Sequence, residues 1–522
     1  MKLRIVSVND VYALDNLPRL RTLVEHARTV DPPDRLLVTM AGDFLSPSIL
    51  SSLDGGRGMV DCLAALGVTH VTFGNHEDDL EESELRARIE ELPATWLGTN
   101  VRGLGPKVRA SEVLEVAGTR VGLLGVVMTD PSVYRRAPFG DRDVRAPIPA
   151  ALAEAERLVR EEECQFVIPL THQFVHDDRA LARAQRDAGH RFPVILGGHE
   201  HQPMTEEEGG TWIVKAGTEA ATAVVVDLET DLDGDLVTTV RLEPVTGWAE
   251  DEHLRARVDL HMARVRELET ATLLSLGPGE KLSSVGTRAR QTSLGALLCT
   301  RIRDVLGVDL CLFNGGGIRA ARDYETSFTY GDLKREVPFD NEIVVVRLPG
   351  RVLRDAVAAS RAHAPTEHGG FLQADDGVTV DASGLVVTHV RSRPLEPARD
   401  YRVALVRNLL LGLDGNEPLV EFAKVHPDRV PDEGSGRDVR IVLVDAFSIA
   451  LWRRLGGFDA VDTNRDEKVT ASEVRDALTR ITMAGASVTA DLIVHALDTN
   501  GDKVISRAEA EAVEMPATEP EG

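Results

Sequence analysis

The feature that most constrains the fold is a series of five short apolar runs, each followed at once by polar residues that can bind metal. Charged segments with helical spacing separate these runs, as in Leu17 to Val30 and Ala150 to Glu163. Such alternation of strand-like and helical segments predicts an α/β domain. The polar groups then stand at the carboxyl ends of five predicted strands.

The five polar groups supply the ligand types of a two-metal site. Two divalent ions about 3.5–4 Å apart can neutralise a phosphate ester, make a water nucleophilic and stabilise the leaving oxygen. Such a site needs a bridging carboxylate with imidazole, amide and carboxylate ligands around it. The runs and their polar groups are Arg4 to Val8 with Asn9-Asp10, Leu36 to Met40 with Gly42-Asp43, Val68 to Phe73 with Gly74-Asn75-His76-Glu77, Phe166 to Leu170 with Thr171-His172, and Val194 to Leu196 with Gly197-Gly198-His199-Glu200-His201.

Composition limits the partners. The formal charge is −25 and aromatic residues make up 4% of the 522 residues. A surface this negative repels nucleic acid and anionic lipid, and few aromatics are available to stack bases. No apolar run approaches the roughly 18 residues of a membrane helix. We therefore expect no nucleic acid and no membrane partner, whereas the predicted two-metal site favours a small phosphorylated substrate; the sequence indicates no oligomeric state.

Changes of pattern divide the chain. A helical segment follows the first α/β region, and a second α/β region has predicted strands at Leu310 to Phe313, Ile343 to Leu348 and Tyr401 to Val406. The predicted divisions are a catalytic domain over 1–245, a helical connector over 246–279, a second domain over 280–445, a pair of acidic loops in helical sequence over 450–513, and a disordered tail over 514–522. The chain begins Met1-Lys2-Leu3-Arg4 in strand-like alternation without an apolar signal segment, which predicts a cytoplasmic location.

The order of these motifs resembles the calcineurin-like metallophosphoesterases. Asn314-Gly315-Gly316-Gly317-Ile318-Arg319 and Tyr330-Gly331-Asp332 further resemble the carboxy-terminal domain of the 5′-nucleotidase/UDP-sugar hydrolase family. The resemblance covers roughly residues 1–445. It implies an N-terminal sandwich of β-sheets flanked by helices and a second α/β domain that binds the rest of the substrate.

The resemblance also implies roles for individual residues. Asp43 would bridge two ions of Mn, Zn, Co or Fe, while His76 and Asp79 would form the catalytic dyad. The implied metal ligands are Asp10, Asp43, Asn75, His172, His199 and His201, and the implied substrate contacts are Arg290, Asn314, Arg319 and Phe371, with Phe371 as one of two rings around a nucleoside base.

Two positions depart from the family pattern. The family has Asp-x-His after the first strand, whereas this chain has Asp10-Val11-Tyr12. We expect Tyr12 to pack against the strand rather than to bind metal. A second base-stacking aromatic is missing after Asp414-Gly415, where Asn416 follows.

The two acidic loops begin at Asp462 and Asp498 and resemble an EF-hand pair that binds Ca²⁺. Each offers oxygen ligands at the loop positions typical of that motif, and each lacks the usual glycine at position 6, where Glu467 and Lys503 stand. The implied calcium ligands are Asp462, Asn464, Asp466, Lys468, Thr470, Glu473, Asp498, Asn500, Asp502, Val504, Ser506 and Glu509. With this small all-α domain appended, three folded parts are predicted.

The sequence thus predicts a metal-dependent phosphohydrolase of the 5′-nucleotidase type, which cleaves a phosphate monoester, expected to be a nucleotide, with a water activated by the metal pair. Two alternatives use the same residues. One is a cyclic phosphodiesterase or nucleotide-sugar pyrophosphatase with the same metal centre. The other is a calcium-responsive binding protein whose phosphatase centre is inactive because Tyr12 replaced a ligand.

Overall fold

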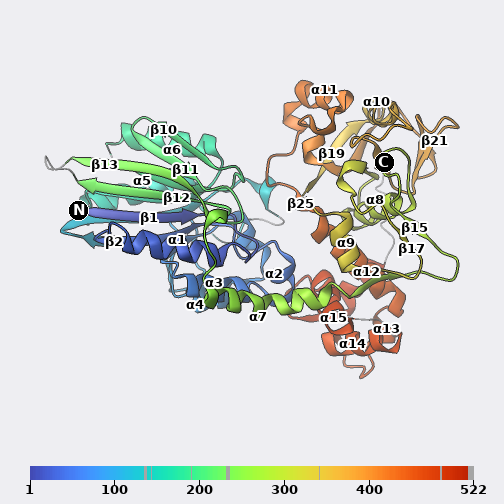
Figure 1. Cartoon of the computed structure of the whole chain (residues 1–522), viewed down its shortest axis with the longest axis horizontal. Helices are drawn as coiled ribbons and strands as arrows, with labels where there is room; N and C mark the ends of the chain where they lie inside the picture. Colours follow the sequence, from blue (N-terminus) through green and yellow to red (C-terminus); the bar gives the residue numbers. More distant parts are fainter. Residues whose placement is uncertain are drawn as a thin grey trace. The chain divides into compact units, whose positions relative to one another are not determined.

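The computed structural model describes residues 1–134, 138–140, 142, 144–189, 191–230, 235–339, 341–481 and 485–514. The chain forms two compact units, Met1–Ala263 and Arg264–Gly522, which are coloured from blue to green and from green to red in Figure 1. Helix α7 (Glu252–Leu268) contains the point of division. Of the predicted tail 514–522, residues 515–522 lie outside the described residues.

Two β-sheets form the centre of the first unit. Their strands run in the orders β13-β12-β1-β2-β3-β4-β5 and β10-β11-β9-β8-β7-β6. Within them, β1 to β5 are parallel neighbours, and so are β7, β8, β9 and β11. The strands are β1 (Lys2–Val8), β2 (Arg35–Ala41), β3 (His70–Thr72), β4 (Thr95–Leu97), β5 (Val108–Arg109), β6 (Ser111–Val116), β7 (Thr119–Val127), β8 (Phe166–His172), β9 (Val194–Gly198), β10 (Met204–Glu208), β11 (Thr211–Lys215), β12 (Thr222–Thr230) and β13 (Leu236–Pro244).

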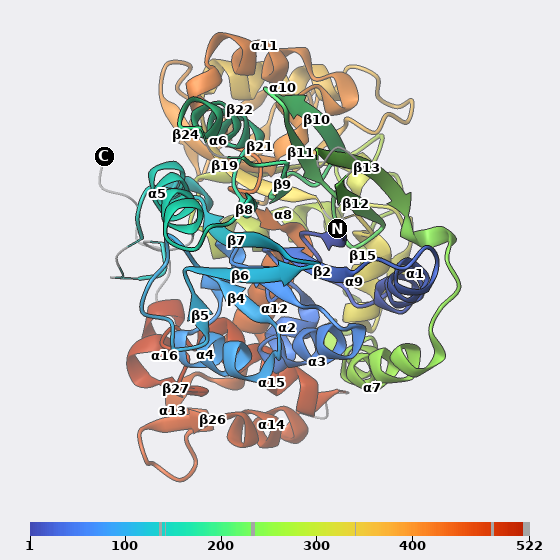
Figure 2. The same ribbon diagram turned by 90° about the vertical axis from the view of Figure 1, so that its left-hand side faces the viewer.

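One apolar core joins the two sheets. Leu3, Ile5 and Leu37 of the first sheet belong to the same buried cluster as Leu123 and Ile168 of the second. The outer face of the second sheet is covered by α5 (Pro147–Arg160) and α6 (Val175–Asp187), which share a second buried cluster with it. The other helices here are α1 (Leu17–Thr29), α2 (Ile49–Asp54), α3 (Arg57–Leu66) and α4 (Glu82–Glu91). The unit is therefore a β-sandwich flanked by helices (Figure 2).

The second unit is built on a five-stranded sheet of order β20-β16-β24-β19-β25. Its strands are β16 (Leu310–Asn314), β19 (Glu342–Pro349), β20 (Leu372–Ala374), β24 (Asp400–Val406) and β25 (Arg437–Asp438), and its helices include α8 (Ser293–Leu306), α9 (Tyr330–Glu336), α10 (Gly350–Arg361) and α11 (Glu417–Val425). Short pairs and a small three-stranded sheet complete it: β14 (Thr272–Ser275) with β18 (Ser327–Thr329), β15 (Leu282–Ser283) with β17 (Asp323–Tyr324), and β21 (Val378–Val380), β22 (Val387–Val390) and β23 (Arg393–Pro394).

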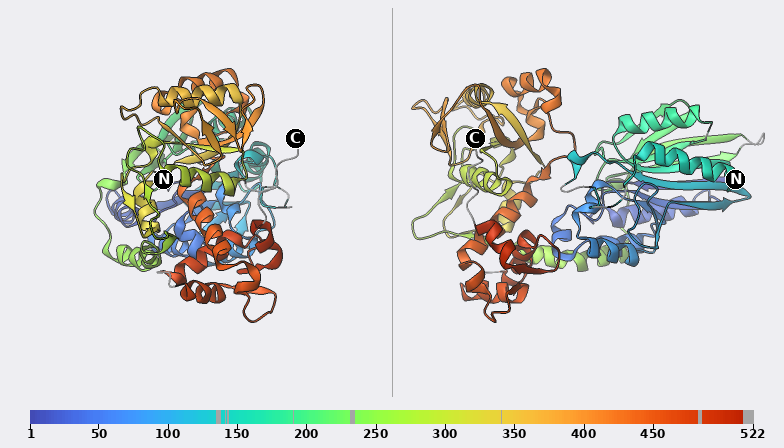
Figure 3. Two further views of the ribbon diagram at one scale, coloured as in Figure 1. Left: turned by 90° about the vertical axis from the view of Figure 1, so that its right-hand side faces the viewer. Right: turned by 180° about the vertical axis from the view of Figure 1, so that it is seen from behind.

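Helix α12 (Val439–Leu455) passes without a break through residues 445–450, where the sequence suggested a division. It packs against α8 and also against α15, because apolar residues lie on most of its sides. Leu451 and Trp452 are part of the buried core of the C-terminal helices, drawn in orange and red in Figure 3. Those elements are α13 (Phe458–Val461), β26 (Lys468–Thr470), α14 (Ala471–Arg480), α15 (Ala486–Leu497), β27 (Val504–Ser506) and α16 (Arg507–Glu514).

Within the described ranges, none of the helices has both the length and the apolar character that crossing a membrane requires.

Trp96 of β4 supports two loops of the first unit. Its side chain is fully buried, and its ring lies 5.4 Å from that of Phe44 and 5.0 Å from that of Phe73, measured between centroids. We predict that Trp96→Ala lowers the free energy of unfolding by about 3–5 kcal/mol, because a large buried ring leaves a cavity. Urea denaturation followed by circular dichroism measures this loss.

Trp212→Ala is the matched control, since Trp212 is only partly buried on β11. Its loss should be clearly smaller. Equal losses for the two variants would contradict the supporting role of Trp96.

Candidate metal centre and substrate-binding residues

The five predicted polar groups meet at one edge of the β-sandwich. Asp10 and Asp43 follow the parallel strands β1 and β2, while His172 and His199 stand at the ends of the parallel strands β8 and β9. Asp10, Asp43 and His199 have positive φ angles of 53°, 54° and 85°. Left-handed backbone is uncommon outside glycine and concentrates at functional sites. The chain thus turns sharply at three of the six predicted ligands.

Three of these side chains form a tight buried group. Asp10, Asp43 and His172 each offer a ligand atom within 4.8 Å of the others. The Nε2 atom of His172 lies 3.1 Å from Asp43 Oδ2 and 4.0 Å from Asp10 Oδ1. His201 Nε2 lies 3.4 Å from the same oxygen of Asp10. Two carboxylates and two imidazoles therefore converge, as a metal centre requires.

Hydrogen bonds orient the ligand atoms. His172 Nδ1 is 2.8 Å from the carbonyl oxygen of Ala41, and Asn75 Nδ2 donates to Val133 O at 3.1 Å. Three buried atoms make no hydrogen bond within the described part of the chain: Nε2 of His172, Nε2 of His199 and Oδ1 of Asn75. Buried polar atoms normally have a partner, so these three fit metal ions as their missing partners.

The charges favour a cation at this place. Burial acts to lower the pKa of His172, but Asp43 and Asp10 outweigh it and raise the pKa to about 10. Burial, helped by His172, holds the pKa of His199 well below its ordinary value. His199 is therefore neutral, which is the form in which imidazole binds metal.

Glycines make room for the ligands. A Cβ atom on Gly42, whose φ is +80°, would lie 2.4 Å from His172 Nδ1. A Cβ atom on Gly74 would lie 2.1 Å from Asp43 Oδ1. No side chain fits at these distances, which explains why glycine precedes Asp43 and Asn75.

His76 and Asp79 are paired, as the family pattern implies. His76 Nδ1 lies 2.8 Å from Asp79 Oδ2, and the Ser46 hydroxyl donates to the same oxygen at 3.3 Å. The backbone N–H of His76 donates to Asp43 Oδ1 at 2.8 Å. The pair is thus tied to the carboxylate that the sequence assigns as the metal bridge.

Glu77 has a structural role that the sequence did not predict, although Glu77 belongs to the motif Gly74-Asn75-His76-Glu77. Its buried carboxylate accepts hydrogen bonds from four backbone N–H groups, those of Asp43, Phe44, Leu45 and Gly74, at 2.6–3.0 Å. Burial and the charge of Asp43 raise its pKa to about 7. Glu77 therefore fastens the loop after β2 to the loop after β3.

Lys215 was also missed. Its fully buried Nζ atom donates to the carbonyls of Gln173 and Gly198, both at 2.7 Å, and pairs with Asp178 at 3.0 Å and with Glu200. Burial acts to lower the pKa of Lys215, but the two carboxylates outweigh it and raise the pKa. The two carbonyls adjoin His172 and His199, so Lys215 fixes the ends of β8 and β9. The feature of the sequence that could have indicated a buried, paired lysine is its position within the apolar run Trp212 to Ala216.

The predicted substrate residues lie in the second unit. Asn314 ends β16, is buried, and donates from Nδ2 to Asp414 Oδ2 at 2.7 Å, while its Oδ1 makes no hydrogen bond within the described ranges. Arg319 is exposed, with its guanidinium 5.6 Å from the centre of the exposed Phe339 ring. Asp414 was not predicted as a contact of Asn314.

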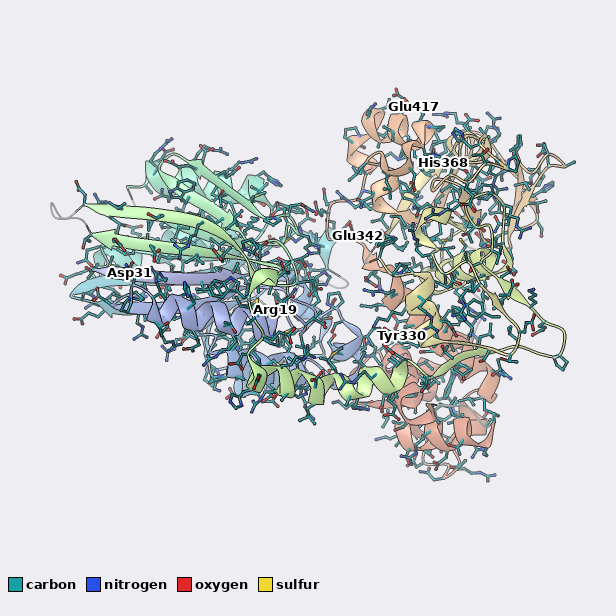
Figure 4. All side chains as sticks on the ribbon, viewed as in Figure 1. Arg19, Asp31, Tyr330, Glu342, His368 and Glu417 are labelled. Atoms are coloured by element: carbon teal, nitrogen blue, oxygen red, sulfur yellow. The ribbon has the colours of Figure 1, made fainter. Side chains whose placement is uncertain are left out.

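The other two predicted substrate residues have different surroundings. Arg290 is exposed and donates to Val285 O from Nε at 3.3 Å and from a terminal nitrogen at 3.0 Å. Phe371 is only 4% exposed, and the guanidinium of Arg361 lies 5.1 Å from its ring centre. Beside it, the N–H of Gly370 donates to His368 Nδ1 at 3.1 Å; His368 is labelled in Figure 4.

Comparison with known proteins identifies both parts. The family description "Calcineurin-like phosphoesterase" matches residues 3–203, and "5'-nucleotidase, C-terminal domain" matches residues 269–421. Protein UshA of Yersinia enterocolitica is 22% identical over 436 residues, 73% of this chain and 78% of UshA. The 5'-nucleotidase of Bos taurus is 23% identical over 492 residues, 83% of each chain.

Solved structures share the fold. The NAD nucleotidase of Haemophilus influenzae gives a TM-score of 0.64 at 17% identity, covering 87% of this chain and 96% of that one. The 5'-nucleotidase precursor of Thermus thermophilus gives 0.52 at 21% identity, covering 81% and 92%.

The two domain matches follow each other in one chain, and both curated relatives extend across them. The chain is therefore a calcineurin-like phosphoesterase with a 5'-nucleotidase C-terminal domain. It belongs to the 5′-nucleotidase/UshA type of metallophosphoesterases, which are phosphoric ester hydrolases with a dinuclear centre of divalent metals.

The predicted cytoplasmic location is wrong. Relatives of the UshA and 5′-nucleotidase type are periplasmic, secreted or membrane-anchored, and the Thermus thermophilus protein is described as a precursor. The strand-like pattern of the first residues was therefore a poor guide to location.

Gly74 tests whether close backbone approach holds the site together. We predict that Gly74→Ala lowers the bound metal per chain, because the added Cβ would displace the carboxylate of Asp43. Metal analysis of the purified protein measures this. Gly247→Ala is the control, since a Cβ there meets nothing within 4 Å, and it should leave the metal content unchanged. Equal metal content in both variants would show that the close approach of Gly74 to Asp43 is not needed for metal binding.

Proposed function

We propose that the protein hydrolyses a phosphate monoester of a nucleotide at a centre of two divalent ions, Mn, Zn, Co or Fe. Asp43 would bridge the ions, Asn75, His172 and His199 would complete one position, and Asp10 and His201 would serve the other. The observation that carries this proposal is the convergence of Asp10, Asp43 and His172 in one buried group, in which His172 Nε2 makes no hydrogen bond to the described residues.

The metal pair supplies charge neutralisation and a nucleophilic water. The chain supplies the proton. Because Asp79 holds Nδ1 of His76, the Nε2 atom is the one that addresses the leaving oxygen. The hydrogen bond from the His76 N–H to Asp43 keeps this imidazole next to the centre. His76 would therefore protonate the leaving oxygen or stabilise its negative charge.

The rest of the nucleotide is assigned to Arg290, Asn314, Arg319 and Phe371. The names of the relatives, 5'-nucleotidase among them, support a nucleotide. The Oδ1 atom of Asn314, which makes no hydrogen bond to the described residues, and the exposed guanidinium of Arg319 are suited to polar groups of sugar or phosphate. Base stacking by Phe371 stays a prediction, since only 4% of this residue is exposed.

A panel of nucleoside monophosphates, cyclic nucleotides and nucleotide sugars tests the substrate class. Turnover of only the cyclic nucleotides and the nucleotide sugars would overturn the monoesterase proposal.

Replacing the bridge should remove both metal and activity. We predict that Asp43→Asn abolishes turnover and lowers metal content, because an amide cannot bridge two cations as a carboxylate does. Assays of phosphate release together with metal analysis check this. Full metal occupancy with normal turnover would exclude a two-metal centre at Asp43.

His76→Ala should separate chemistry from metal binding. We predict that the variant keeps its metal ions while turnover falls by roughly 10²–10⁴, the usual range for a positioned proton donor. The metal content of the same sample is the control. If the metal were lost, His76 would be a ligand and its assignment as the proton donor would be wrong.

We further propose that the loops of residues 462–473 and 498–509 are an EF-hand pair that binds Ca²⁺. Both non-glycine residues at position 6 have left-handed backbone, with φ of 62° at Glu467 and 65° at Lys503. Val469 pairs with Ile505 in the short ladder of β26 and β27. These features are typical of the motif and support the proposal.

The two loops differ in their terminal glutamates. Glu473 uses Oε2 to accept from the N–H and hydroxyl of Thr470, and its buried Oε1 makes no hydrogen bond within the described residues. Glu509 uses both oxygens within its own loop, Oε1 for the Thr499 N–H at 2.7 Å and Oε2 for the Ser506 N–H at 2.9 Å. Binding at the second loop must therefore break a hydrogen bond that the first loop does not have.

Calcium should bind more tightly at the first loop. We predict that Glu473→Gln weakens the tighter calcium event by about tenfold or more, while Glu509→Gln affects only the weaker event. Calorimetry on the full chain, loaded with its catalytic metal, measures both. An unchanged titration in the two variants, or no heat at millimolar calcium in the parent protein, would leave the loops without a calcium role.

A further inference from the structure

The hydroxyl of Tyr12 lies among atoms of the proposed metal centre. Its Oη atom is 3.2 Å from Asp10 Oδ1, 3.4 Å from Asp43 Oδ2 and 3.3 Å from His201 Nε2. His201 Nε2 is itself 3.4 Å from Asp10 Oδ1. Tyr12 Oη, Asp10 Oδ1, Asp43 Oδ2 and His201 Nε2 thus form a group of four atoms, which we call the cage. The four interatomic distances given above, its edges, are nearly equal.

The position of Tyr12 is fixed by its surroundings. It stands two residues after Asp10, and its backbone N–H donates to Glu219 Oε2 at 3.1 Å, as does that of Ala13 at 2.7 Å. The ring meets His201 edge-on, with centroids 5.8 Å apart, and meets His76 in the same way at 6.2 Å. These contacts hold the ring whether or not it carries a hydroxyl.

The measured spacings suit shared coordination better than hydrogen bonding. A phenol has one hydrogen to donate, and O–H···O distances usually lie near 2.7–2.8 Å. Around Tyr12 Oη, three neighbours lie at 3.2–3.4 Å. Ligand atoms that share an ion with bonds of about 2.1 Å lie roughly 3.0 Å apart along an octahedral edge and roughly 3.4 Å apart along a tetrahedral one. The cage edges fall within that range.

We propose that Tyr12 binds metal through its oxygen and completes the position of Asp10 and His201, rather than only packing against the strand as the sequence suggested. This inference rests on the proposed two-metal centre. A bound ion would take the phenol oxygen as a ligand in place of the phenol proton, which would pass to solvent.

The proposal predicts which metal this position prefers. Asp10, Asp43 and Tyr12 supply three oxygen atoms and His201 supplies one nitrogen, whereas histidine at position 12 would give two of each. Oxygen-rich sites favour hard ions, and imidazole suits zinc. Tyr12 therefore directs this position toward Mn²⁺ or Fe³⁺ at the expense of Zn²⁺.

The test uses the full chain, stripped of metal with a chelator and then supplied with Mn²⁺, Zn²⁺ or Fe³⁺ alone. Tyr12→Phe removes only the oxygen, and Tyr12→His restores an imidazole. Tyr401→Phe is the matched control, because it removes a phenol of the second unit that accepts a hydrogen bond from Glu396 N. Calorimetry and metal analysis report affinity and stoichiometry, and visible absorption of the Fe³⁺ form reports a phenolate-to-iron charge-transfer band.

With calcium present to fill the two proposed EF-hand loops, we expect two Mn²⁺ per chain in the parent protein and in Tyr401→Phe. In Tyr12→Phe one of the two should bind about tenfold more weakly or be lost, and the charge-transfer band should disappear. Tyr12→His should raise zinc affinity relative to manganese at that position. Unchanged affinities with a band that persists in Tyr12→Phe, or no band in any form, would overturn the role of Tyr12.

Failure of the proposed function gives a different result. If the parent protein itself held fewer than two ions, and Asp43→Asn changed nothing, the two-metal centre would be wrong whatever Tyr12 does. If the parent protein held two ions and lost them in Asp43→Asn but not in Tyr12→Phe, only the inference about Tyr12 would fail.

Discussion

The first unit depends on the burial of two carboxylates, Asp10 and Asp43, within a few ångströms of each other. Each is almost completely enclosed, and buried like charges are costly unless they are compensated. His172 lies between them, Asn9 and the His199 N–H donate to Asp10, and the His76 N–H donates to Asp43. The fold therefore places donors and imidazoles where a positive charge is needed, and metal ions would supply the rest.

Two further buried ionisable groups, Glu77 and Lys215, bind the backbone of the loops that carry the predicted metal ligands. Glu77 collects four backbone N–H groups from the loops after β2 and β3, and Lys215 collects two backbone carbonyls at the ends of β8 and β9. One buried carboxyl group thus organises donors, and one buried ammonium group organises acceptors. Removing either would leave buried partners unpaired, which is more costly than losing an exposed ion pair. These contacts lie at or next to the left-handed backbone of Asp43 and His199 and help to maintain it.

In the second unit, fewer contacts fix the predicted substrate residues than fix the predicted metal ligands in the first. Asn314 and Asp414 form one hydrogen-bonded pair at the end of β16, whereas Phe371 is enclosed beneath Arg361. In the role proposed for Asn314, a substrate that used its Nδ2 atom would compete with the hydrogen bond to Asp414. The C-terminal helices share their core with α12. They are therefore continuous with the second unit in packing as well as in sequence.

The sequence by itself determined the class of fold and the identity of the family, because both follow from local patterns: apolar runs of strand length, glycine before three of the six predicted ligands, and ligand types in a fixed order. It also placed His76 and Asp79 three residues apart, a spacing that one short turn brings into contact. Only the tertiary structure decided the roles of Glu77 and Lys215 and the surroundings of Tyr12. Their partners lie as far as 207 residues away in the chain, as with Tyr12 and Glu219, and no local pattern records which strand ends meet. The structure also showed that Phe371 is buried, since burial depends on Arg361 and the surrounding sheet rather than on the motif that contains the ring.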